Sequence, residues 1–159
     1  MKSQKKAVIF SLLTILWTAV IFSFSLQPAE ASASLSGGLL QRLLDWFYWC
    51  TGLQIPTSFA HFMIRKIAHF SEFFLLGILG YQACKNWLGK WWPALCYGAV
   101  IAVMDEHIQY FTASGRAMLV TDMILDTAGV ATAIVLTLLF AEIAAKRKNK
   151  NTKNKESVA

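Results

Sequence analysis

Long apolar segments alternate with short polar connections along this chain of 159 residues. Residues 7–26 are twenty consecutive uncharged residues, and a helix that rises about 1.5 Å per residue crosses a hydrocarbon core of about 30 Å over that length. Three further apolar segments follow, at about 64–84, 91–108 and 122–145. This pattern predicts an all-α fold, a polytopic membrane helical bundle of about four transmembrane helices within residues 1–145.

The connection after the first apolar segment has a different pattern, at about residues 35–50. Its leucine and phenylalanine side chains fall on one face of a helix, and Gln41, Arg42 and Asp45 fall on the other. An amphipathic helix of this kind lies in the outer membrane interface or packs as a loop helix on the bundle. The sequence supports both interpretations equally.

Composition favours a membrane location over a soluble domain. Hydrophobic residues make up 56% of the chain and charged residues only 15%, against about 25% in a typical soluble domain. The three cysteines, Cys50, Cys84 and Cys96, lack the spacing of a disulfide framework or a zinc site. We interpret them as packing residues.

The basic residues predict an orientation. Eleven of the fifteen precede the first span, separate the second from the third, or follow the fourth. The positive-inside rule therefore predicts a plasma-membrane protein with both termini in the cytoplasm, and with residues 27–63 and about 107–121 outside. A rival interpretation treats residues 1–33 as a cleaved signal, although the apolar run exceeds a usual signal core of about 7 to 15 residues. We expect residues 146–159 to be a disordered basic cytoplasmic tail near anionic lipid.

The few ionisable residues of the spans gather in the predicted outer half of the bundle. They recur at intervals of three or four residues, which places them on single stripes of their helices. Because a charged side chain near the centre of a membrane helix costs about 2.5 to 3.5 kcal/mol, the stripes are expected to face one another rather than lipid. This predicts an outward-facing polar pocket. Its candidate ligand-binding residues are Arg65, Lys66, His69, Glu72, Asp105, Glu106, Gln109, Arg116, Asp122 and Asp126.

Small residues on the same spans favour close helix packing beside this pocket. Without a Cβ, a glycine lets two helix backbones approach closely in a membrane. The candidate contact positions are Gly77, Gly80, Gly98 and Gly129.

Several motifs in the second to fourth spans resemble the VanZ-like family of small bacterial membrane proteins. They are Arg-Lys-x-x-His-x-x-Glu at 65–72, Asp-Glu-x-x-Gln at 105–109, then Gly-Arg, then Asp122 with a polar residue four positions later and a glycine three beyond. Two departures are Ala113-Ser114, where a proline often precedes Gly-Arg, and Asp126, where asparagine is common. The resemblance implies a plasma-membrane protein that affects susceptibility to glycopeptides such as teicoplanin, and it implies no particular reaction.

The function that we favour is binding or handling of a cell-envelope amphiphile. Arg65, Lys66 and Arg116 would receive an anionic group such as a lipid pyrophosphate or a carboxylate, since guanidinium groups bind such anions in a bidentate way. The expected partners are the lipid bilayer and either a lipid-linked cell-wall precursor or a glycopeptide, and not nucleic acid. A homo-oligomer of the chain is also compatible with the sequence.

The alternative is a membrane-embedded enzyme acting on a lipid-linked substrate. Its candidate catalytic residues are His69, Glu72 and Asp105, with the imidazole and one carboxylate as an acid–base pair. A metal-assisted variant would hold a divalent cation among these residues and Glu106. Flanking cations already offset much of the acid charge and no dedicated metal spacing is present, so we expect neither a metal nor another cofactor. A proton-linked transporter is a third class, although four spans without an internal repeat would have to dimerise.

A purely structural interpretation competes with all three classes. The acidic and basic side chains would form a buried salt-bridge network that fixes the helix register. His69 would then be a hydrogen-bonded packing residue. Because ionisable groups inside a membrane are functional candidates by default, the functional and structural interpretations both stay open.

Overall fold

The computed structural model describes residues 2–26, 29–112 and 118–156, with side chains throughout these ranges except at 2, 3, 29–37, 39, 43 and 151–156. The described residues form five α-helices and no strand, which confirms the all-α prediction. The helices are α1 (Lys2–Ser25), α2 (Ala29–Thr51), α3 (Thr57–Leu88), α4 (Trp92–Thr112) and α5 (Val120–Glu156).

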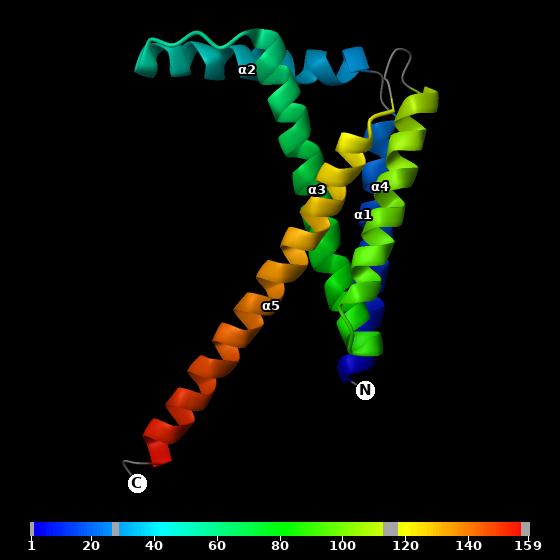
Figure 1. The fold of residues 1–159 in the computed structure, drawn as a ribbon, viewed down its shortest axis with the longest axis vertical. Coiled ribbons are helices and arrows are strands. Elements are labelled where there is room, and N and C mark those ends of the chain that lie inside the picture. The colour runs from blue at the N-terminus through cyan, green and yellow to red at the C-terminus, as the bar shows by residue number, and fades with distance from the viewer. Residues whose placement is uncertain (1, 27–28, 113–117, 157–159) are drawn as a thin grey trace.

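Four of the helices form an up-and-down bundle, and α2 lies across one end of it (Figure 1). Helices α1, α3 and α4 lie side by side, and α5 crosses α3 and α4 before it diverges from them. We call the end of the bundle near α2, where α1 and α4 end and α3 and α5 begin, the α2 end. The opposite end, which holds both termini, is the terminal end.

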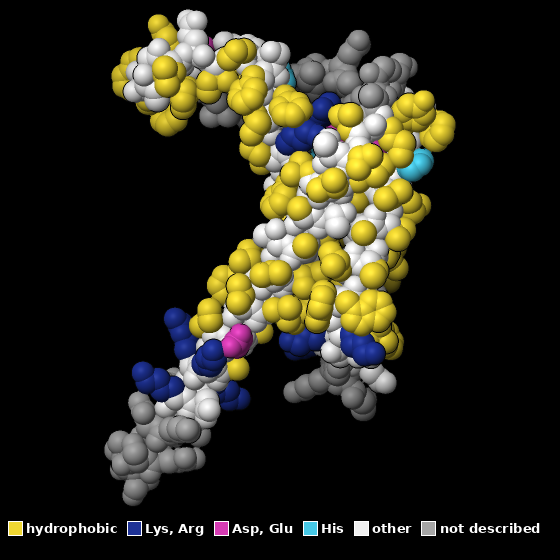
Figure 2. Space-filling model, viewed as in Figure 1, with side chains coloured by type: hydrophobic (Ala, Val, Ile, Leu, Met, Phe, Trp, Pro, Cys, Tyr) yellow, Lys and Arg dark blue, Asp and Glu magenta, His cyan; other side chains and the backbone are white. Residues whose placement is uncertain are grey.

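Two helices of the described chain are long and apolar enough to cross a membrane, over Gln4–Ser25 and Val120–Lys150. Helices α3 and α4 have sufficient length, but they carry most of the predicted polar residues. Figure 2 shows hydrophobic side chains over the middle of the bundle, with lysine and arginine side chains toward its two ends. This surface distribution is typical of a membrane protein.

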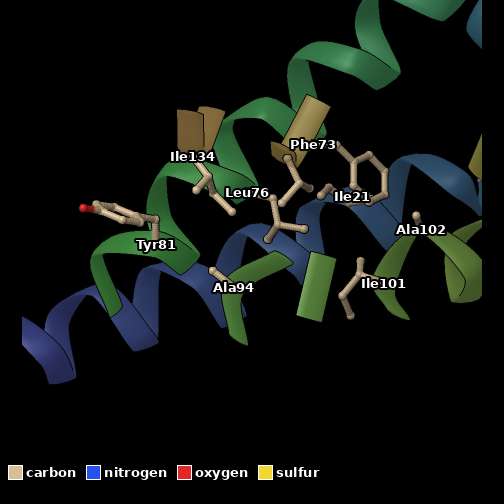
Figure 3. Packing of buried hydrophobic residues seen from close by; sticks show 9 residues of the cluster. Ile21, Phe73, Leu76, Tyr81, Ala94, Ile101, Ala102 and Ile134 are labelled. Atoms are coloured by element: carbon tan, nitrogen blue, oxygen red, sulfur yellow. The ribbon is translucent and has the colours of Figure 1, made fainter. Parts of the chain in front are cut away.

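The bundle core is apolar and depends on close backbone contacts. Phe73 and Leu76 of α3 pack with Ile21 of α1, and residues of α4 and α5 complete the cluster (Figure 3). A Cβ added to Gly98 would lie 2.6 Å from a Val130 methyl group, so the Val130 side chain would have to shift to accommodate it. The other buried residues of this cluster are Tyr81, Ala94, Ile101, Ala102, Val130 and Ile134.

Two other predicted glycine contacts join α3 to α5. A Cβ at Gly77 would lie 2.8 Å from both the Val130 carbonyl oxygen and the Ala133 Cβ. A Cβ at Gly129 would lie 2.7 Å from the Phe70 carbonyl oxygen. At Gly80 the nearest atom would lie at an ordinary 3.6 Å, so that glycine is not required by packing.

Two helices, α2 and α5, are longer in the structure than the sequence predicts. Helix α2 begins at Ala29 rather than near residue 35. The prediction began too late because the first turns are rich in alanine and serine and have no amphipathic pattern. The prediction of a disordered tail from residue 146 is wrong in the described part, since α5 continues to Glu156. Alanine, lysine and glutamate favour helix, and Lys146 forms an i,i+4 ion pair of 2.6 Å with Glu142.

Candidate functional site

Asp105 is the centre of a buried polar cluster near the α2 end. Its side chain is 0% exposed, and it accepts hydrogen bonds from α1 and from its own helix, α4. Ser25, the last residue of α1, donates its hydroxyl hydrogen to Asp105 Oδ1, and Gln109 donates from Nε2 to Asp105 Oδ2 at 2.7 Å. Gln109 Nε2 also lies 3.4 Å from Ser25 Oγ. Two neutral donors thus fix the orientation of the carboxylate.

His69 of α3 and Asp126 of α5 bring the other two helices into this cluster. His69 Nδ1 lies 3.9 Å from Asp105 Oδ2. One nitrogen of His69 and one carboxylate oxygen each of Asp105 and Asp126 all lie within 4.8 Å of one another. Asp126 is only 1% exposed, and its Oδ1 has no hydrogen-bond partner among the residues that the structure describes. A buried carboxylate oxygen without a hydrogen-bond partner costs free energy, so its presence needs an explanation.

An ion pair between Lys66 and Asp122 lies one helical turn nearer the α2 end. Lys66 precedes His69 by three residues on α3, and Asp122 precedes Asp126 by four on α5, so the same two helix faces meet again. The two side chains are 17% and 16% exposed, and the Lys66 ammonium also lies 5.3 Å from the centre of the Phe62 ring. Figure 2 shows basic side chains in this region. The Lys66–Asp122 ion pair is thus partly accessible and lies beside the buried cluster.

Glu106 has a separate role at the start of α5. Its side chain is 4% exposed, and Oε1 accepts a hydrogen bond of 2.7 Å from the Leu119 backbone N–H. Leu119 immediately precedes α5, so a carboxylate of α4 satisfies a donor at the N-terminus of the next helix. This contact fixes the polar end of α5 against α4.

The structure separates the predicted site residues into groups. His69, Asp105, Gln109 and Asp126 lie in one cluster, and Lys66 pairs with Asp122 beside it. Arg65 and Glu72 are partly buried, and within the described chain neither side chain has a hydrogen bond or an ion pair. Arg116 lies outside the described residues.

Sequence analysis missed two contacts from α1. Ser25 binds Asp105, and Trp17 Nε1 donates a hydrogen bond of 2.9 Å to the backbone carbonyl of Glu72. A single serine at the end of an apolar helix does not indicate a buried hydrogen bond to a distant residue. The indole is a donor that requires a partner when buried, but its partner here is a backbone group.

The fold and the cluster define a class, a helical bundle in which buried polar groups from four helices meet near one end. The chain belongs to the VanZ/LLP1 family, because the family model matches residues 10–141. No curated protein and no solved structure matches the chain. Together with the two apolar helices, the family membership indicates a membrane protein.

Proposed function

We propose that the protein crosses the bacterial plasma membrane four times, through α1, α3, α4 and α5, with both termini in the cytoplasm. Both termini lie at one end of the bundle, where most of the lysines are found. Helix α2 would lie in the outer interface, because it extends sideways from the bundle and exposes Trp46, Tyr48 and Trp49.

This topology is testable by labelling with a thiol reagent that does not cross membranes. Cysteine replaces the exposed Gln54 between α2 and α3, or Lys146 on α5, after the three native cysteines are changed to serine. We expect Gln54→Cys to react in intact cells and Lys146→Cys to react only after permeabilisation. The reverse pattern would place the polar cluster on the cytoplasmic side.

We further propose that the α2 end binds the anionic group of a cell-envelope amphiphile in an outward-facing pocket. The observation that supports this most strongly is the Lys66–Asp122 ion pair, whose lysine is partly exposed near the start of α5. A partly exposed lysine at the level of an outer membrane leaflet can exchange its carboxylate partner for a phosphate. Arg65 and Arg116 stay candidates for the same role.

Family membership connects this proposal to cell-wall-directed antibiotics. By resemblance, the protein would reduce susceptibility to glycopeptides such as teicoplanin. Handling of a lipid-linked cell-wall precursor is compatible with this effect, because glycopeptides are directed at the cell wall. The partner would then be the precursor lipid or the glycopeptide itself.

Binding of farnesyl pyrophosphate tests the proposal, since this compound carries a pyrophosphate on a short isoprenoid chain. We expect native mass spectrometry of the purified protein to show farnesyl pyrophosphate bound in preference to farnesol. Lys66→Gln should weaken that binding about tenfold, and Lys90→Gln, at an exposed position near the terminal end, should leave it unchanged. Equal binding of the pyrophosphate and the alcohol would refute an anion-binding role.

The second candidate is an acid–base enzyme acting on a lipid-linked substrate. The observation in its favour is the position of His69 Nδ1 at 3.9 Å from Asp105 Oδ2, which resembles an imidazole held near an orienting carboxylate. Incubation with farnesyl pyrophosphate and measurement of released phosphate distinguish the two candidates. Release that His69→Gln abolishes supports the enzyme, and binding without release supports the binding protein.

A further inference from the structure

We propose that His69, Asp105 and Asp126 form a binding site for one divalent transition-metal ion of the Zn²⁺ or Mn²⁺ type. The three residues come from α3, α4 and α5, and they are different from the combination that the sequence suggested. Their placement depends on how these helices cross. Metal binding at this cluster does not depend on the amphiphile proposed above.

The distances between the three ligand atoms suit a metal ion. Donors that lie about 2.1 Å from a tetrahedral Zn²⁺ are about 3.4 Å from one another. Here His69 Nδ1 and Asp105 Oδ2 are 3.9 Å apart, and all three ligand atoms lie within 4.8 Å of one another. Small rotations of the side chains would therefore bring them into coordination distance.

The unpartnered oxygen of Asp126 points independently to a ligand. This carboxylate is 1% exposed, and within the described part of the chain its Oδ1 has no hydrogen-bond partner. Lys66, a cation one turn away, is already paired with Asp122. A carboxylate in low dielectric is strongly disfavoured without a compensating charge or hydrogen bond, and a bound metal ion would supply that charge.

The surroundings of Asp105 resemble those of a metal-binding carboxylate. Protein carboxylates that bind metals are usually held by hydrogen bonds from neighbouring side chains. Gln109 donates to Asp105 Oδ2 at 2.7 Å, and Ser25 donates to Oδ1. One imidazole and two carboxylates suit Zn²⁺ or Mn²⁺ better than Cu⁺, which prefers thiolates. Three protein ligands also leave a coordination position for water or an anion.

The first experiment measures metal binding to the full-length protein, purified without a polyhistidine tag and stripped with a chelator. We expect calorimetry with Zn²⁺ and with Mn²⁺ to give one site per chain for at least one of the two ions. Asp126→Asn should weaken binding at least tenfold, and Gln109→Ala about tenfold. Glu142→Gln, an exposed change on the same helix, should have no effect. Absence of binding in the unmodified protein, or binding unchanged in Asp126→Asn, would overturn the proposal.

A second readout on the unmodified protein does not require any variant to fold. Co²⁺ added to the stripped protein should give visible absorption of a nitrogen- and oxygen-bound ion. The charge-transfer band of a thiolate should be absent, since none of the three ligands is a cysteine. A thiolate band, or a spectrum identical to that of Co²⁺ in buffer, would show that this cluster is not the metal site.

Discussion

The middle of the bundle and its α2 end hold their helices together in different ways. In the middle, Gly77 and Gly98 bring α3 and α4 against Val130 of α5 with no space for a further carbon. At the α2 end, hydrogen bonds and charges connect the helices, with Asp105 and Asp126 at the centre. The difference lies along one face of α5, where two aspartates are followed by Gly129 and Val130.

The close contacts in the middle of the bundle and the polar contacts at its α2 end contribute differently to helix association. In lipid there is no hydrophobic drive between helices, so close packing of small residues stabilises their association. The glycine contacts therefore explain how closely α3, α4 and α5 approach one another in the middle of the bundle. Buried carboxylates make insertion harder, so Asp105 and Asp126 are candidates for a function other than assembly.

The strongest test of the packing region is Gly77→Leu. The new side chain would begin 2.8 Å from the Val130 carbonyl oxygen, and backbone atoms cannot move aside as a flexible side chain can. We expect the free energy of unfolding, from denaturant titration in mixed micelles, to fall by about 3 kcal/mol, the upper end of the usual cost of overpacking. Gly38→Leu is the control, because nothing lies within 4 Å of a Cβ on that glycine. Equal losses in the two variants would show that this contact does not hold the bundle together.

Asp105→Asn tests the polar cluster with almost no change of shape. The new amide would put a donor where Asp105 accepts from Ser25 or Gln109, which leaves donors opposed in a buried site. We expect a loss of about 1–3 kcal/mol in the same titration.

Glu72→Gln is the matched comparison for that change. Glu72 has no side-chain hydrogen bond or ion pair in the described chain, so the amide should have a smaller effect. The buried salt-bridge network considered in the sequence analysis would give a large loss instead, because Glu72 would then be paired with a basic side chain. A loss from Glu72→Gln as large as that from Asp105→Asn would favour that network.

Glu106→Ala tests the connection between α4 and the start of α5. It removes the acceptor of the Leu119 N–H and leaves a helix N-terminus without that partner. Loss of a helix cap typically costs about 1 kcal/mol. Glu106→Gln retains a carbonyl oxygen and should recover part of this loss. Identical stability of the Ala and Gln variants would show that the contact contributes nothing.

The smallest expected effect is the coupling between Lys66 and Asp122. A double-mutant cycle with Lys66→Ala and Asp122→Ala should give a coupling energy of about 0.5–1 kcal/mol. The exposed Lys146–Glu142 pair should give only about 0.3–0.5 kcal/mol, because solvent screens it more. A ligand that displaces Asp122 needs a weak pair here, so a much larger coupling would argue against exchange with a phosphate.

The helices were largely predictable from the sequence, because apolar runs determine which segments are helical. Their ends were less predictable. The charged residues after Ala145 resemble a disordered tail in composition, although they also favour a continued helix once α5 is formed. The start of α2 lacks the periodicity that marked its later turns.

The polar residues near the α2 end could be listed from the sequence, but their contacts could not be predicted from it. Spacing places residues on a stripe of one helix, and it does not say how that stripe is turned toward a neighbour. Arg65 and Lys66 were both candidates on α3 and lie about 100° apart around the helix, and the structure shows that Lys66 makes the ion pair with α5. Ser25 was missed because the partner that gives it meaning, Asp105, is 80 residues away.

The continuation of α5 beyond the bundle has a practical consequence for imaging. A membrane protein of 17.8 kDa offers little mass outside the detergent micelle by which to align its images. Because α5 is one uninterrupted helix to Glu156, a second helical protein fused in register at that residue would be carried at a defined angle. Such a fusion provides a rigid handle for electron microscopy while leaving the polar cluster, at the other end of the same helix, untouched.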